Sequence, residues 1–243
     1  ARSKGLELQE HIILYIKRHL GRTIDDTKEL PLNDIINTLP YFVIDDGNKQ
    51  PLIAIPVSDY GVRPYPIDKS SFEYLTPEQI CAKILLKLRQ EASKYLHDAN
   101  ITKAVITVPS SFTKSQKKAV QISAKLAGFK QIDLLDESTA VVLSYALEPV
   151  TTKERILIYD FGASKIDVSL FTYDSKSLMI LGNNNINVGG IDIDNALFEW
   201  LLKKYEIENK TPTLNDLCLL TQAKNAKISL SFNTEVSIAD FTI

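Results

Sequence analysis

The sequence is poor in the residues that build metal sites and disulfide frameworks. Its 243 residues include two cysteines, Cys81 and Cys218, and three histidines, His11, His19 and His97. The cysteines lie far apart and belong to no CxxC or Cys/His pattern, and the histidines form no cluster. We therefore expect two buried thiols in a reducing compartment, with no metal centre built on cysteine or histidine.

Long apolar runs and strong charge of one sign are also missing. No run approaches the ~18–20 apolar residues that a membrane span needs, so we expect no membrane association. The formal net charge is −2, which gives no electrostatic reason to expect nucleic acid as a partner. The chain opens at Ala1 in a polar segment without a secretory signal, as an excised piece would.

Several well-known catalytic motifs are absent: GxxxxGK[ST], GxGxxG after the first strand, GxSxG and HExxH. A P-loop, a dinucleotide-binding fold, a serine hydrolase elbow and a zinc protease helix therefore find no support. The remaining polar inventory consists of strand-end carboxylates, small-residue turns and lysines. These are Glu137, Asp160, Asp167, the turns 162–164 and 189–190, Lys17 and Lys227. Such an inventory suits phosphoryl transfer, in which carboxylates hold Mg²⁺, backbone amides contact phosphate and a lysine neutralises developing charge.

Alternating strand and helix signals fill the middle of the chain. Thr76 and Thr113 each begin a capping box, which predicts helices to about His97 and to Gly128. Strand signals cover 101–108 and 132–135, and a further helix follows to about Leu147. This β-α-β-α order predicts a sheet with helices packed on it, where chemistry collects at the carboxyl ends of strands. Glu137 lies at such an end, although an N-cap acid would look the same.

The segment 155–174 predicts two strands joined by a small-residue turn. Asp160 ends the first strand, the turn covers 162–164, and Asp167 lies in the second strand. Small side chains let a phosphate approach the backbone, and acids at a strand end can hold hydrated Mg²⁺. An ordinary glycine hairpin remains the alternative for this segment taken alone.

The other expected elements are less regular. We expect a helix over 1–21, a short helix at 32–39, strands at 41–44 and 52–57, and a strand-like run at 178–187 with a polar interruption. Further helices follow Gly189-Gly190 and cover 216–230, and a last strand covers 236–243. A glycine pair before a helix can bring amides to an anion, or can simply form a tight turn.

Four segments carry a more specific signal: VITVPSSFTKSQKKAVQISAKLAGF, LLDESTAVVLSYAL, ILIYDFGASKIDVSLF and NVGGIDIDNAL. Together, and in this order, they resemble the nucleotide-binding domain of the 70-kDa heat-shock chaperones, of the actin and hexokinase superfamily. The resemblance implies an α/β, actin-like ATPase (ribonuclease H-like) fold with two lobes, ATP and Mg²⁺ between them, and a domain incomplete at both ends. The expected parts are 1–76 and 77–149 in the first lobe, and 150–187 and 188–243 in the second.

The resemblance also assigns roles to individual residues. It makes Lys17, Glu137, Asp160 and Asp167 catalytic, with Asp160 and Asp167 facing Mg²⁺ through water. It places nucleotide contacts at Gly162, Ala163, Ser164, Lys165, Gly189, Gly190, Lys227 and Ser231, and a proline switch at Pro109. Taken alone, each of the lysines Lys17 and Lys227 would be read as a solvated surface charge.

The chain departs from the family pattern around the expected nucleotide. The family turn Gly-Gly-Gly-Thr is here Gly162-Ala163-Ser164-Lys165, which narrows the amide cradle and replaces a hydroxyl with a lysine. An acid is lost beside Gly190, and the adenosine segment has Lys224 and Ile228 where the family has Glu and Arg. A lost arginine removes a planar stacking surface. The sequence thus indicates a divergent member of the family that keeps the expected catalytic acids.

We therefore expect part of the ATPase domain of a chaperone that couples ATP binding and hydrolysis to protein folding. A non-hydrolysing paralogue that acts as a co-chaperone or nucleotide-exchange partner is the alternative, and a sugar or acetate kinase is a third interpretation. The resemblance implies ATP or ADP and Mg²⁺ as cofactors, with unfolded clients, J-domain proteins and nucleotide-exchange factors as partners. We expect a cytoplasmic protein, with the endoplasmic reticulum as the alternative, and poor ATP binding by these residues alone.

Overall fold

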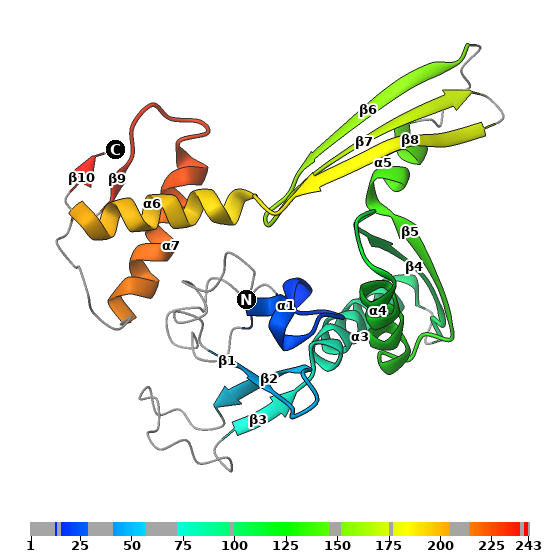
Figure 1. The fold of residues 1–243 in the computed structure, drawn as a ribbon, viewed down its shortest axis with the longest axis horizontal. Helices are drawn as coiled ribbons and strands as arrows, with labels where there is room; N and C mark the ends of the chain where they lie inside the picture. The colour runs from blue at the N-terminus through cyan, green and yellow to red at the C-terminus, as the bar shows by residue number, and fades with distance from the viewer. Residues whose placement is uncertain are drawn as a thin grey trace. The chain divides into compact units, whose positions relative to one another are not determined.

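The chain forms a mixed α/β fold, as the sequence predicts (Figure 1). The structure, a computed structural model, describes residues 13, 16–28, 41–56, 72–97, 100–145, 152–174, 177–204, 214–238 and 241–242. The chain divides into two compact units. Unit 1 comprises Ala1–Val108 and Phe112–Leu135, and unit 2 comprises Pro109–Ser111 and Asp136–Ile243. The four-part division expected from the sequence stays a prediction.

An antiparallel sheet of order β1-β2-β3 forms one part of unit 1. Its strands are β1 (Phe42–Asp45), β2 (Pro51–Pro56) and β3 (Phe72–Leu75). Ile53 and Tyr41 are buried, and with Ile16 and Ile80 they form one apolar cluster. The first two strands confirm the prediction, whereas β3 was not predicted, since four residues between proline-rich segments give little periodic signal.

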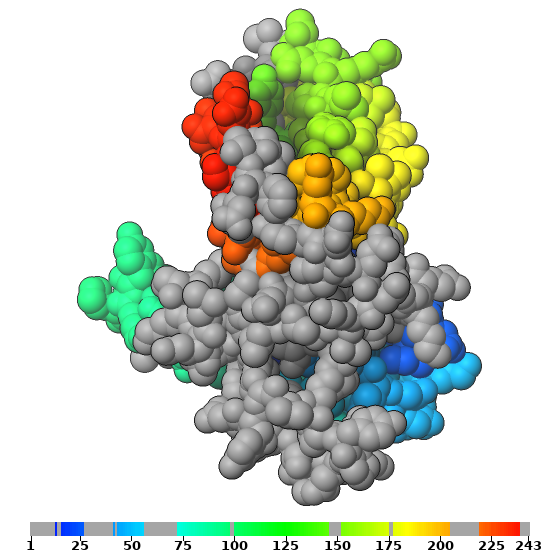
Figure 2. Space-filling view, turned by 90° about the vertical axis from the view of Figure 1, so that its left-hand side faces the viewer, coloured from blue at the N-terminus to red at the C-terminus, as the bar shows by residue number. Residues whose placement is uncertain are grey.

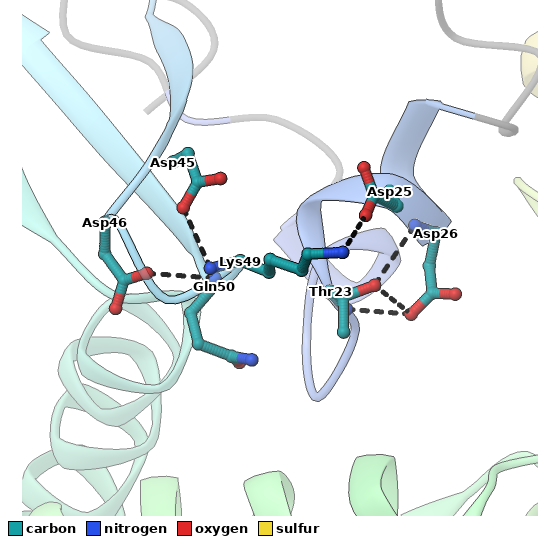
Figure 3. Close-up of polar contacts among 7 residues, drawn as sticks. All are labelled: Thr23, Asp25, Asp26, Asp45, Asp46, Lys49 and Gln50. Carbon is teal, nitrogen blue, oxygen red and sulfur yellow. Dashed lines mark hydrogen bonds and ion pairs between the residues drawn. The ribbon is translucent and has the colours of Figure 1, made fainter.

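Aspartate side chains shape the turn between β1 and β2 (Figure 3). Asp45 Oδ1 accepts backbone hydrogen bonds from Gly47 and Lys49, and Asp46 Oδ1 accepts them from Asn48 and Gln50. This is the local bonding that favours Asp in turns. Lys49 Nζ also lies 3.3 Å from Asp25 Oδ2 in the short helix α1 (Ile24–Lys28), so the turn contacts that helix.

Two capped helices and a pair of strands complete unit 1. The helix α3 (Pro77–Leu96) begins at Thr76 and α4 (Lys114–Leu126) begins at Thr113, and both capping boxes are formed. The two helices lie side by side (Figure 1). Strand β4 (Lys103–Val108) pairs with β5 (Gln131–Asp136). These elements confirm the predicted β-α-β arrangement.

Unit 2 is built on a three-stranded antiparallel sheet of order β6-β7-β8. Its strands are β6 (Glu154–Phe161), β7 (Ile166–Asp174) and β8 (Ser177–Ile186). The outer strands expose large apolar side chains, among them Leu157, Tyr159 and Met179. Atoms of these strands, light green to yellow, are visible at the upper right of Figure 2. Helix α5 (Glu137–Tyr145) contacts β6.

Two packed helices follow the sheet. Helix α6 (Gly190–Lys204) contacts α7 (Leu214–Ser229), and the short strands β9 (Ser237–Ile238) and β10 (Phe241–Thr242) pair beside α7. Their shared core is an apolar cluster of Leu201, Leu219, Ala223, Ala226 and Ile238.

Three local predictions differ from the structure. In place of the end of a helix over 1–21, η3 (Ile16–Arg18) is a single 3₁₀ turn, closed by a left-handed Gly21. β8 runs through its polar stretch without interruption, with a β-bulge opposite Leu170 and Phe171. The last strand, predicted over 236–243, is two short strands that pair antiparallel to each other. The expected helix at 32–39 lies outside the described residues.

Candidate functional site

The β6–β7 hairpin brings two of the expected catalytic acids together. Asp160 and Asp167 are direct cross-strand partners. Residues directly opposite in an antiparallel pair extend from the same face of the sheet, with Cβ atoms about 5 Å apart. Asp167 is buried and Asp160 is exposed. The hairpin therefore presents one sheltered and one solvated carboxylate from adjacent positions.

The turn of this hairpin carries a lysine that folds back onto Asp167. The Gly162 N–H donates to the Lys165 carbonyl oxygen at 2.9 Å, which closes the turn. Lys165 Nζ lies 3.0 Å from Asp167 Oδ1, in a pair whose side chains are 18% and 12% exposed, and it also donates to Ser111 Oγ. Among the described residues, that Asp167 oxygen accepts no well-aligned hydrogen bond, so the contact is ionic.

The two small-residue turns meet through their backbones. The Gly190 N–H donates to the Gly162 carbonyl at 3.1 Å, and the Ile191 N–H donates to the Ala163 carbonyl at 2.8 Å. A Cβ on Gly189 would come within 2.5 Å of the Ser164 nitrogen, so only glycine fits there. The sequence predicted both turns, and the structure shows that they form one junction.

Amides of the second turn are bonded within the protein. The Gly189 N–H donates to Asp192 Oδ2 at 2.6 Å, and the Gly190 N–H donates to Gly162 as described above. The Asp192 N–H in turn donates to the Gly189 carbonyl at 3.0 Å, so the segment forms the tight turn that the sequence left open as the alternative. The anion-binding role of Gly189 and Gly190 stays a prediction.

A second lysine joins the same junction from α7. Lys227 Nζ donates to the Gly190 carbonyl at 2.8 Å and lies 2.5 Å from Asp194 Oδ1. Asp194 was not singled out from the sequence, although it shares the buried face of α6 with Ile191 and Leu201, and an acid at such a position signals a partner. Ser231 Oγ contacts the Lys227 carbonyl at 3.5 Å.

The remaining acid and the proline switch also belong to unit 2. Glu137 is the first residue of α5, so it begins a helix as well as following a strand. It is half-buried, and its helix contacts β6, the strand that carries Asp160. Pro109 is buried directly after β4. The catalytic role of Glu137 and the switch role of Pro109 stay predictions.

Lys17 lies in unit 1, in the 3₁₀ turn η3. Its Nζ lies 5.8 Å from the centre of the Phe112 ring, within cation–π range. Two residues on, His19 is fully buried, and among the described residues neither ring nitrogen has a hydrogen-bond partner. Burial, aided by the Arg18 and Arg22 charges, lowers the pKa of His19 to about 4. The approach of Lys17 to the acids of unit 2 stays a prediction.

The capacity of this site to hold a metal ion rests on its paired acids. Within the described ranges, no group of three or more His, Cys, Asp or Glu side chains is arranged to hold one. Asp160 and Asp167 offer the one or two carboxylates that Mg²⁺ prefers. However, the Lys165 ammonium already lies against Asp167, so the pair as it stands does not fit a hydrated Mg²⁺ at that carboxylate.

Comparisons with known proteins show the family of the chain. The family model described as Hsp70 protein matches residues 1–243. A curated relative, chaperone protein dnaK1 of Synechocystis sp., is 30% identical over 251 aligned residues, which cover 100% of this chain and 33% of the relative. The chain thus spans about a third of the length of that relative. Within the described residues, no helix combines the length and apolarity that a membrane crossing needs.

Proposed function

Because this chain belongs to the Hsp70 family, we propose that it forms part of the ATP-binding domain of a 70-kDa heat-shock-type chaperone. The whole protein would couple ATP binding and hydrolysis to protein folding. The mixed α/β fold accords with the actin-like ATPase fold of that family. The comparisons give no support to the co-chaperone alternative or to a sugar or acetate kinase.

The observation that carries the proposal is the junction of the two turns. The segments 162–165 and 189–191 come from distant parts of the sequence, yet they are joined by two backbone hydrogen bonds and by Lys227. A paired-acid hairpin adjoins this junction directly. In this proposal the junction holds the first turn, 162–165, in a fixed position beside the paired acids, so that the turn and the acids together face a polyphosphate.

Each residue has a role in this proposal. Gly162, Ala163, Ser164 and Lys165 lie beside the phosphates, with Gly189 and Gly190 supporting them. Lys227 and Ser231 adjoin the adenosine, and Asp160, Asp167, Glu137 and Lys17 orient the attacking water and offset charge. Mg²⁺, when bound with nucleotide, would neutralise phosphate charge near Asp160.

The proposals for partners and compartment are supported by family membership alone. We propose that the whole protein acts on unfolded polypeptides with J-domain proteins and nucleotide-exchange factors, and that it does so in the cytoplasm. The comparisons give no support to the endoplasmic reticulum.

The test is ATP binding and single-turnover hydrolysis by the full-length protein. We expect Lys17→Ala to bind ATP but to hydrolyse it about 10²-fold more slowly, since charge stabilisation of the transition state is lost. Lys118→Ala, at an exposed lysine of α4, is the matched control and should behave like the parent. Absence of ATP binding by the parent would refute the proposed function.

A further inference from the structure

The Lys165 ammonium lies against Asp167, one of the two acids expected to face a metal ion. We propose that the Lys165 ammonium is a tethered cation that takes over the charge-neutralising part of Mg²⁺ at Asp167, so that nucleotide binding depends little on Mg²⁺. The inference rests on the proposed nucleotide site and adds to it which cation balances the charge of Asp167.

The first argument is the electrostatics of the hairpin. Asp160 and Asp167 are direct cross-strand partners, and like charges in that relation destabilise a sheet unless a cation lies nearby. Asp167 is also buried, and a buried carboxylate needs a positive partner. Lys165 Nζ, at 3.0 Å from Asp167 Oδ1, meets both needs without an external ion.

The second argument is that the ammonium is held in place. A lysine side chain is flexible, and a surface ion pair costs side-chain entropy. Here the side chain is only 18% exposed, and its Nζ also donates to Ser111 Oγ, 54 positions away in sequence. Two anchors from separate segments restrict Nζ to the neighbourhood of Asp167.

The third argument is competition for one oxygen. Mg²⁺ keeps several waters in a near-ideal octahedron, and it must reach its carboxylate through that shell. The ammonium contacts Asp167 Oδ1 directly, so a hydrated dication there would meet both a steric and a charge conflict. Lys227 does not compete with a metal ion for a carboxylate of the hairpin, because its partner Asp194 lies in α6.

The test compares ATP affinity of the full-length protein in Mg²⁺ and in EDTA. In the parent, removal of Mg²⁺ should raise the dissociation constant for ATP by less than about threefold. In Lys165→Thr, the same removal should raise it by about tenfold or more. Ser111→Ala should fall between them, because Lys165 loses one anchor. Lys153→Thr, at an exposed lysine, is the control and should match the parent. A parent that loses about tenfold in EDTA, or a Lys165→Thr variant that matches the parent, would overturn the inference.

A measurement without nucleotide separates this inference from the proposed function. Mn²⁺ serves as the probe, followed by electron paramagnetic resonance. Lys165→Thr should bind Mn²⁺ about tenfold more tightly than the parent, and adding Asp167→Asn should remove the gain. If the parent binds no ATP, the proposed function fails, and this measurement still decides the role of Lys165. Equal Mn²⁺ binding by the parent and Lys165→Thr would refute that role.

Discussion

Gly189 lies so close to the backbone of Ser164 that a Cβ on residue 189 would come within 2.5 Å of the Ser164 nitrogen. The close approach holds the start of α6 against the hairpin turn. No flexible side chain can move aside to relieve such a contact, because the atoms that it meets belong to the backbone.

We therefore expect Gly189→Ala to lower the free energy of unfolding by about 2 kcal/mol, within the range for overpacked sites. Gly182→Ala is the matched control, because a Cβ there meets nothing within 4 Å. The control should change stability by less than about 0.5 kcal/mol. Urea unfolding of both variants measures the difference, and equal effects would contradict the packing argument.

The Lys227–Asp194 pair should matter more than an exposed pair. Its side chains are 27% and 9% exposed, so Lys227→Met leaves a buried carboxylate without its cation. We expect a loss of about 2–3 kcal/mol, below the range for fully buried pairs because the lysine is partly solvated. Asp194→Asn in the same background should recover part of the loss.

The control for this prediction is Lys83→Met, which breaks the pair with Glu73. The side chains there are 63% and 53% exposed, and the expected loss is below about 1 kcal/mol. Thermal or urea unfolding of the four proteins forms the comparison. If Lys227→Met cost no more than Lys83→Met, the pair would be contributing little.

Stability should fall on acidification because of His19. Its pKa is lowered from 6.5 to about 4 in the folded chain, chiefly by burial, so the unfolded state binds more protons between these pH values. The stabilisation is present above pH 6.5 and is lost progressively down to about pH 4, by up to about 3 kcal/mol. His19→Leu should remove this part of the pH dependence, measured by urea unfolding at pH 4 to 8. An unchanged slope would show that His19 is not its source.

Cys81 should be a slow nucleophile in the folded protein. Burial, with a smaller effect from Glu78, raises the pKa of its thiol to about 11. Because only the thiolate reacts, alkylation by iodoacetamide at pH 8 should be at least about tenfold slower than in urea. A Cys218→Ser background isolates the one thiol, and mass spectrometry follows its modification. Equal rates in both states would contradict the effect of burial.

Local chemistry made part of this structure predictable. Thr76 and Thr113 define helix starts through hydrogen bonds within three residues, so their capping boxes can be read from sequence. The Asp160–Asp167 pairing likewise follows from one short hairpin. Such features need no knowledge of distant segments.

Long-range partners were not predictable in the same way. Lys165 meets Ser111 from 54 positions away, and Lys227 meets Asp194 across the α6–α7 packing. A lysine in sequence carries no mark of its partner, and Lys227 taken alone would pass for a solvated charge. The junction of the two turns was missed for the same reason, because backbone hydrogen bonds leave no trace in side-chain patterns.

The backbone bonds from Gly190 to Gly162 and from Ile191 to Ala163 have a mechanical consequence. Two hydrogen bonds between the same two segments resist a hinge motion that a single hydrogen bond would allow. Helix α6 and the hairpin should therefore move together as one rigid body, and any bending within unit 2 should occur in its other segments.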